Sequence, residues 1–170
     1  SHPPSAERVA RNRETVAKLG AGGELGVERY TARLAPLRQM KPAYDKYDQA
    51  LLAMQKKDVA GARKLATEAA QLVPAEGRFH QLLGDIDLGE KRNRDSLAHY
   101  RRAMDQSPDY FGSWLGAGVA QYRLGNRTEA RQYLTRSMEL LPTAPAALFL
   151  GNIARDAGDA PAARKLYQMA

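Results

Sequence analysis

The chain has 170 residues, which is long enough for one domain with a sizeable hydrophobic core. Its 26 Lys and Arg against 19 Asp and Glu give a net charge of +7, which favours acidic partners only weakly because the basic residues are scattered. The lack of cysteine excludes disulfides, thiolate-zinc sites and a thiol nucleophile. No apolar run approaches the roughly 20 residues that a membrane span needs, so we expect no span.

The N-terminal segment, residues 1–26, predicts a helix followed by a glycine-rich joint. The helix is expected from about Ser5 to Leu19, because two prolines before Ser5 favour a helix start. Four glycines then interrupt it, namely Gly20, Gly22, Gly23 and Gly26. The chain opens without a methionine, so we expect it to be a piece of a longer protein, with any targeting segment upstream.

Residues 27–42 predict a connecting helix. Apolar residues recur on one side of this segment, and Pro36 predicts a kink. Pro42 is expected to end the helix, and a repeat domain is expected to follow in residues 43–170.

A period of 34 residues organises the rest of the chain. Gly84 recurs as Gly118, and Pro108 recurs as Pro142. Each block has an apolar run of helix length, a turn and a second such run. A period of this length indicates stacked helical hairpins, because a single hairpin cannot bury its own apolar faces. The sequence therefore predicts an all-α fold, a right-handed superhelical solenoid.

The pattern resembles the tetratricopeptide repeat (TPR), which implies about four helical hairpins behind the N-terminal helical extension. Three copies start at Ala43, Gly77 and Phe111, and a fourth follows after a step of 33 residues. Repeat position 8 faces position 20 where the two helices approach most closely, so Gly84 is expected against Ser96. Bulky side chains at position 24 are expected to fill the space to the next hairpin.

A solenoid of this type binds through its concave face, which the first helix of each hairpin lines. Projecting the lining positions onto this chain gives tyrosines, arginines and amides, a composition that suits an extended polypeptide. The alternative for any single one of these residues is simple exposure to solvent. We predict a protein or peptide partner in a groove lined by Tyr44, Tyr47, Arg78, Gln81, Asp85, Tyr122, Arg123, Asn152 and Arg155.

The chain shows no pattern for enzymatic chemistry. It contains no His-Glu-x-x-His, no glycine-rich phosphate loop and no Ser-His-Asp pattern, so we predict no catalytic residues and no cofactor in this fragment. His80 and His99 match no metal-ligand spacing and are expected to be structural or surface residues. Asp85 and Asp87 point to different faces of one helix, and we expect both to be solvated.

A local basic cluster consists of Lys91, Arg92, Arg94, Arg101 and Arg102. Nucleic-acid binding would require such a stripe to continue across the repeats and to alternate with exposed aromatic residues. The cluster stays local, so we interpret it as a solvated helical face and expect no nucleic-acid partner. An RNA-binding helical repeat is the less favoured alternative.

Two further segments point to a family of proteases. Residues 1–9 (SHPPSAERV) resemble the Ser/Thr-His-Pro-x-x-x-x-Arg-Ile/Val stretch that closes the catalytic domain of HtpX-like and BepA-like zinc metallopeptidases. Residues 84–89 (GDIDLG) are similar to the first-helix sequence in the TPR tail of the BepA-type members. The order of motif, helix, linker and repeats also fits this family.

The resemblance implies the C-terminal, non-catalytic part of a bacterial cell-envelope zinc metallopeptidase, with a periplasmic location. Residues 1–26 would be the linker helix and joint that follow the missing protease domain, and this domain would be a partner within the same parent chain. Zinc would belong to the parent. His2 is the one position that carries over, as a possible extra zinc ligand in the intact parent only, and the fragment itself should hydrolyse nothing.

The resulting hypothesis is a protein–protein interaction module. The module would recruit or position protein substrates or partners for that protease, for example in the quality control of outer-membrane proteins. The alternative is a free-standing TPR scaffold, unrelated to proteolysis, in the cytoplasm. Under the first reading, a signal peptide and His-Glu-x-x-His must be encoded upstream of Ser1.

Overall fold

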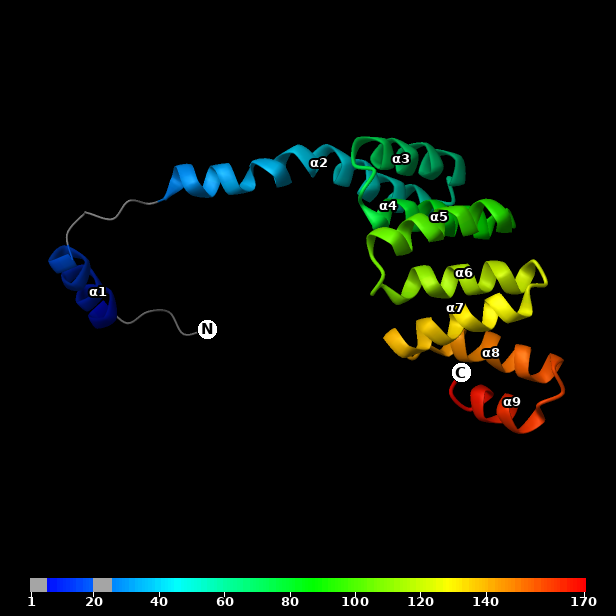
Figure 1. Cartoon of the computed structure of the whole chain (residues 1–170). Coiled ribbons are helices and arrows are strands. Elements are labelled where there is room, and N and C mark those ends of the chain that lie inside the picture. The colour runs from blue at the N-terminus through cyan, green and yellow to red at the C-terminus, as the bar shows by residue number, and fades with distance from the viewer. Residues whose placement is uncertain (1–5, 20–25) are drawn as a thin grey trace. The chain divides into compact units, whose positions relative to one another are not determined.

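A computed structural model describes residues 6–19 and 26–170 of the chain, and every regular element in these two ranges is helical (Figure 1), which confirms the predicted fold class. Most of the expected glycine joint lies outside the described residues, as do His2 and Ser5. The chain divides into two compact units, Ser1–Gln39 and Met40–Ala170. The described helices are α1 Ala6–Leu19, α2 Val27–Gln55, α3 Val59–Leu72, α4 Gly77–Gly89, α5 Asn93–Gln106, α6 Phe111–Arg123, α7 Arg127–Leu140, α8 Ala144–Asp156 and α9 Ala160–Tyr167.

Helix α2 runs without a break from residue 27 to residue 55, so the predicted helix end at Pro42 is wrong. A proline inside a helix leaves the carbonyl group four residues earlier without its amide partner. For Pro36 and Pro42 these carbonyls belong to Ala32 and Arg38, which are exposed, so water can bind them. The helix therefore continues past both prolines and supplies the first half of the first hairpin.

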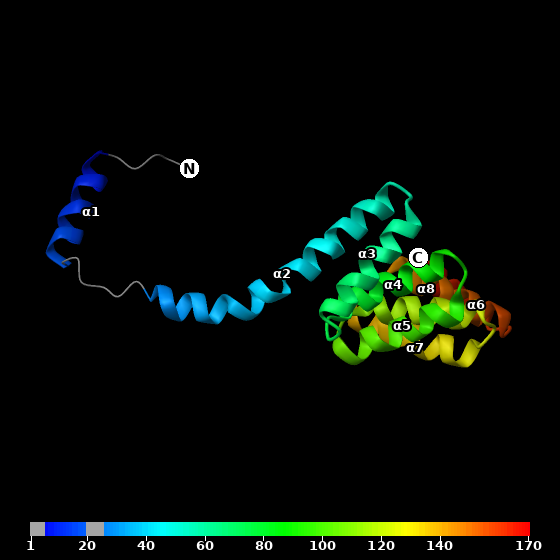
Figure 2. The same cartoon turned by 90° about the horizontal axis from the view of Figure 1, so that it is seen from above.

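The unit Met40–Ala170 is a stack of helical hairpins. Helix α4 packs on α5, α6 on α7 and α8 on α9, and the hairpins join through the pairs α3–α4, α5–α6 and α7–α8. Figure 2 shows α4, α6 and α8 on one side of the stack, with α5 and α7 on the other. Helix α6 also touches both α4 and α8. We call the surface of α4, α6, α8 and the C-terminal part of α2 the inner face, and that of α3, α5, α7 and α9 the outer face.

The hairpins follow the predicted register. Pro74, Pro108 and Pro142 each lie in the turn between one hairpin and the next, where no helical hydrogen bond is lost. Helices α4, α6 and α8, which follow these turns, start at residues 77, 111 and 144. The starts confirm both the 34-residue step and the 33-residue step to the last repeat.

The turn inside each hairpin contains one residue with a left-handed backbone. These four residues occupy the same repeat position: Lys57 (φ 63°), Lys91 (φ 62°), Gly125 (φ 87°) and Gly158 (φ 80°). A left-handed conformation costs an L-residue roughly 1–2 kcal/mol, whereas glycine adopts it freely. The first two repeats therefore carry backbone strain that the last two avoid.

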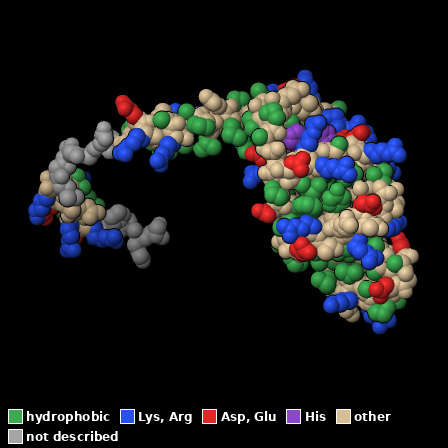
Figure 3. All heavy atoms as spheres, viewed as in Figure 1, with side chains coloured by type: hydrophobic (Ala, Val, Ile, Leu, Met, Phe, Trp, Pro, Cys, Tyr) green, Lys and Arg blue, Asp and Glu red, His purple; other side chains and the backbone are tan. Residues whose placement is uncertain are grey.

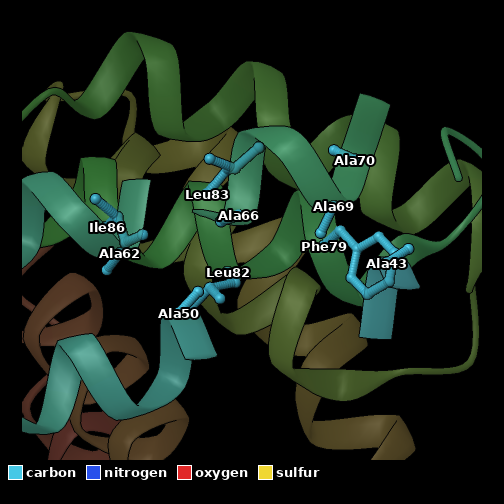
Figure 4. Packing of buried hydrophobic residues seen from close by; sticks show 10 residues of the cluster. All are labelled: Ala43, Ala50, Ala62, Ala66, Ala69, Ala70, Phe79, Leu82, Leu83 and Ile86. Atoms are coloured by element: carbon cyan, nitrogen blue, oxygen red, sulfur yellow. The ribbon is translucent and has the colours of Figure 1, made fainter. Parts of the chain in front are cut away.

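Alanine dominates the contact between the first two hairpins. Figure 4 shows Phe79 beside Ala43 and Leu82 beside Ala50, within a cluster whose members are all at most 9% exposed. Small side chains let the helix backbones approach closely, and Phe79 fills the remaining space. The first repeat, although poor in large apolar residues, thus still forms a packed junction with the second.

The tightest contacts at the repeat glycines involve the position 24 side chains, rather than position 20 as predicted. A Cβ atom on Gly84 would lie 2.7 Å from Cε1 of Tyr100, and one on Gly118 would lie 2.6 Å from Cγ of Leu134. A Cβ on Gly116, in the next hairpin, would lie 2.2 Å from Cζ of the same tyrosine. Tyr100 is fully buried, so its ring is enclosed between α4 and α6.

Candidate peptide-binding groove

All nine predicted groove residues lie on the inner-face helices. Helix α2 contributes two of them, α4 three, α6 two and α8 two. None is fully buried: Tyr44, Tyr47, Gln81, Tyr122 and Asn152 are half-buried, and Arg78, Asp85, Arg123 and Arg155 are exposed. Position and exposure are therefore compatible with a binding role, and their local contacts divide them into two groups.

The first group surrounds a hollow between α4 and the start of α6. This hollow has a volume of about 430 Å³, and Arg78 and Gln81 line its α4 side. Ser113 of α6 and the turn residues 106–110 line the other side. Arg78 forms no ion pair with any residue in the described part of the chain. An unpaired guanidinium beside an open hollow is suited to bind a carboxylate or a carbonyl oxygen.

Asp85 lies one helical turn after Gln81 and is tied to the core. The Tyr100 hydroxyl donates a hydrogen bond of 2.7 Å to Oδ1 of Asp85. Burial raises the pKa of Asp85, while the hydrogen bonds from Tyr100 and Gln81 act in the opposite direction. The pKa of Tyr100 is raised as well, first by burial and then by the nearby Asp85 charge. The groove is therefore partly dehydrated here, which strengthens polar contacts with a ligand.

Tyr44 and Tyr47 pack edge-on and tilted against the buried ring of Phe79, with ring centroids 5.2 and 5.4 Å away. The Tyr44 hydroxyl donates a hydrogen bond to Glu76, and this bond is the main cause of the raised pKa of Tyr44. Both rings thus support the first hairpin junction while their edges stay on the inner face.

The second group lies nearer the C-terminal ends of α6 and α8 and is largely engaged within the protein. Arg123 donates a 2.7 Å hydrogen bond to the carbonyl of Leu88 at the end of α4. The Tyr122 ring packs on Phe149, and its other neighbour is the guanidinium of Arg127 at 4.0 Å. Arg123 and Tyr122 therefore have structural roles in addition to their exposure.

The two predicted residues of α8 also have partners within the last hairpin. Tyr167 donates a hydrogen bond of 2.8 Å to Oδ1 of Asn152. Arg155 pairs with Asp156 at 2.9 Å, and this pairing lowers the pKa of Asp156. The structure thus brings Tyr44, Tyr47, Arg78, Gln81 and Asp85 into one region and separates them from the α6 and α8 residues.

Projection of helix positions missed the turn that closes the hollow. Ser107 and Asp109 belong to the segment between α5 and α6, and Tyr110, which follows them, is 43% exposed. The proline at 108 signals this turn in the sequence. The hollow forms only because the turn bends toward α4, and helix periodicity carries no information on that bend.

Asp87 is buried rather than solvated, so the prediction for this residue is wrong. Its side chain is 2% exposed, and its Oδ1 lies 2.7 Å from both Arg63 and Arg92. His99 lies 3.6 Å from the other carboxylate oxygen. Asp85, by contrast, faces the inner side, which confirms that the two carboxylates point to different faces. A buried carboxylate is tolerated here because cations from two helices and a turn surround it.

The histidines are parts of the second hairpin. His80 is buried and its Nε2 lies 3.0 Å from the Pro74 carbonyl, and the His99 ring stacks on His80 at 6.3 Å. Among residues 6–19 and 26–170, no three His, Cys, Asp or Glu side chains are grouped to hold a metal ion. No described helix combines the length and apolarity needed to cross a membrane.

Paired helices stacked into a superhelix, with an open inner face, define the helical-repeat class of binding domain. Residues 82–145 match the family model described as tetratricopeptide repeat. The chain is thus a tetratricopeptide repeat protein, and TPR domains are protein–protein interaction modules.

One curated relative shares the repeat sequence. The tetratricopeptide repeat-containing protein trd-1 of Caenorhabditis elegans is 32% identical over 65 residues, which is 38% of this chain. The matched stretch is only 8% of the length of that protein. The similarity therefore concerns the repeats and not the remainder of the relative.

Solved structures agree on the fold. A crystal structure of MamA has a TM-score of 0.70 at 12% identity and covers 99% of this chain and 94% of its own. The TPR domain of Arabidopsis OM64 has a TM-score of 0.67 at 18% identity, covering 69% and 98%. The first TPR of Spaghetti (RPAP3), bound to the HSP90 peptide SRMEEVD, also has a TM-score of 0.67, at 16% identity and with 69% and 94% covered. At these identities the likeness shows the fold alone.

Proposed function

We propose that the inner face of the repeat unit binds an extended segment of another protein, with the hollow between α4 and α6 as its central contact. The observation that carries this proposal is the unpaired Arg78 at the edge of a 430 Å³ hollow. The RPAP3 domain, which is bound to a peptide, supports the idea that this fold can hold one.

The groove residues suit a peptide with mixed chemistry. Arg78 can bind a carboxylate, and Gln81 can pair with the peptide backbone as both donor and acceptor. The exposed ring of Tyr110 offers a surface for an apolar side chain. We expect binding through one anchored acidic or carbonyl group beside Arg78, with an apolar neighbour.

A peptide-display selection on the full immobilised chain, followed by titration calorimetry of the selected peptides, tests this proposal. The informative variant is Arg78→Glu, because Arg78 is exposed and an acidic residue in the first turn of α4 suits the helix dipole. We expect affinity to fall about tenfold or more, the range for one charge-assisted contact. Arg101→Glu on the outer face is the matched control and should bind normally. Equal affinity of wild type and Arg78→Glu would show that the peptides bind elsewhere.

We further propose that the repeats belong to a cell-envelope zinc metallopeptidase, for which they position protein substrates or partners. The resemblance of residues 1–9 and 84–89 supports this proposal, and periplasmic location and a role in outer-membrane protein quality control follow from it. Zinc chemistry would lie wholly in the rest of the parent chain, and we assign no zinc-dependent step to the described residues. The coding sequence upstream of Ser1 tests it: a signal peptide and His-Glu-x-x-His are expected, and their absence would favour the free-standing scaffold.

A further inference from the structure

The outer face is much more basic than the inner face. Helices α3, α5, α7 and α9 carry ten Lys and Arg against five Asp and Glu, whereas α4, α6 and α8 carry three of each. The excess positive charge of the chain is therefore concentrated on the side opposite the groove. Such a one-sided field attracts an acidic partner to the outer face.

The centre of this charge lies on α5. Arg94, Arg101 and Arg102 are separated by seven and eight residues, so they share one exposed side of the helix. None of the three pairs with a carboxylate in the described part of the chain. Lys64 on the neighbouring helix α3 is likewise exposed and without an ion pair. The unpaired cations thus remain available to a ligand.

A hollow of about 330 Å³ opens beside these arginines. Its lining residues come from α3, the α4–α5 hairpin and the turn between them, and they are Arg63, Asp87, Arg92, Asp95, Ala98, His99 and Arg102. The buried Asp87 holds Arg63 and Arg92 in place, each at 2.7 Å, and both also reach Glu90. The walls are therefore fixed before any ligand arrives, which reduces the entropy lost on binding. Figure 3 shows the histidine atoms in this region with Lys and Arg side chains around them.

We propose that this outer basic surface, formed by Lys64, Arg94, Arg101 and Arg102 with the adjacent hollow, docks an acidic segment of a protein. A glutamate or aspartate side chain of that segment would enter the hollow beside Arg102, while neighbouring acidic residues would face Arg94 and Arg101. The site is separate from the groove between α4 and α6, so one chain could hold two protein segments at once. The failure of either site would leave the other standing.

The chemistry of the surface favours a protein over nucleic acid or a membrane. Nucleic acid binding relies on exposed aromatic rings for base stacking, and neither α3 nor α5 presents one, since Tyr100 is fully buried. Asp87 and Asp95 in the hollow would repel a continuous phosphate backbone, whereas spaced carboxylates can avoid them. Helix α5 also has no exposed large apolar side chain that could enter a bilayer.

Fluorescence anisotropy of the full chain with a labelled peptide of alternating glutamate and glycine tests the proposal. The variant is Arg101→Glu with Arg102→Glu, and the matched control is Arg164→Glu with Lys165→Glu on α9. Both double variants reverse two adjacent, exposed basic residues on the outer face, so they change the net charge equally. We expect the α5 variant to weaken binding about tenfold or more and the α9 variant to weaken it less than threefold, because close contacts outweigh the screened long-range field. A glutamine-glycine peptide should not bind.

Several results would overturn the proposal. Equal losses in the two double variants would mean that only net charge matters, and no saturable binding of the acidic peptide would remove the site. Tighter binding of an oligouridylate RNA, or of vesicles that contain phosphatidylserine, would assign the surface to another class of partner. Circular dichroism of each variant confirms that the helices are intact. Arg78→Glu should leave this binding unchanged, which distinguishes it from the groove.

Discussion

The enclosed ring of Tyr100 makes a sharp prediction for the variant Gly116→Ala. The new methyl group would lie 2.2 Å from Cζ and 2.6 Å from the hydroxyl oxygen of Tyr100. A normal carbon–carbon contact is about 3.5–4.0 Å, so the ring or the backbone has to move by more than an ångström. The ring cannot retreat toward α4, because it already touches Gly84 there, and its hydroxyl is fixed by Asp85.

The expected cost follows from two opposing effects. Overpacking of a tight core costs about 1–3 kcal/mol, and replacing a helical glycine by alanine returns about 0.5–1 kcal/mol. We therefore expect Gly116→Ala to lower the free energy of unfolding by about 1–2 kcal/mol. Gly89→Ala is the control: no heavy atom lies within 4 Å of its new Cβ, so the variant should be neutral or slightly stabilised.

Urea unfolding followed by circular dichroism and by the fluorescence of Trp114 measures both variants. Trp114 is the single tryptophan and lies on the same helix as Gly116, so it reports on the junction directly. Introducing Tyr100→Leu, which copies Leu134 of the next repeat, should shrink the cost of Gly116→Ala. Wild-type stability of Gly116→Ala, or an unchanged cost in the Tyr100→Leu background, would refute the enclosed-ring interpretation.

Three further substitutions probe the charges and turns by chemical denaturation. Because burial raises the pKa of Asp85, its contribution to stability is full below its unfolded pKa of about 4 and is lost as pH rises through the folded value; Asp85→Asn should thus match wild type in acid and exceed it at neutral pH, and a constant difference across pH would contradict this. Asp87→Asn should lose about 2–3 kcal/mol of stability, less than the ~3–5 kcal/mol of a fully buried pair since Arg63 and Arg92 are partly exposed, and an unchanged unfolding curve would argue against the ion pairs. Lys57→Gly should raise stability by about 1 kcal/mol by relieving a left-handed turn, and a loss of stability would show that the lysine has another role.

Periodicity predicted the repeats well because the packing itself is periodic. A glycine at 84 and 118 and a proline at 108 and 142 mark positions where every hairpin needs the same backbone approach or turn. The helix starts at 77, 111 and 144 follow directly from that pattern. Pro42 misled the prediction because the freed carbonyl lies in an exposed stretch of α2, and the sequence pattern does not report that exposure.

The chemistry of individual polar residues was less predictable. The burial of Asp87 depends on Arg63, which lies 24 residues away and belongs to the preceding hairpin. Arg123 reaches the end of α4 in the same way, across one repeat. Contacts of this kind are set by the superhelical twist, which the repeat period alone does not specify. The hollow beside Arg78 depends in turn on the path of the turn that contains Tyr110.

Site-specific photocrosslinking tests the central claim, binding of an extended polypeptide on the inner face, most directly. A photoreactive p-benzoylphenylalanine is introduced at Gln81 on the inner face or, as a control, at the exposed Ala98 on the outer face. With a display-selected peptide, we expect a crosslink from position 81 and none from position 98. A crosslink from position 98 alone would place the peptide on the outer face and contradict the proposed groove.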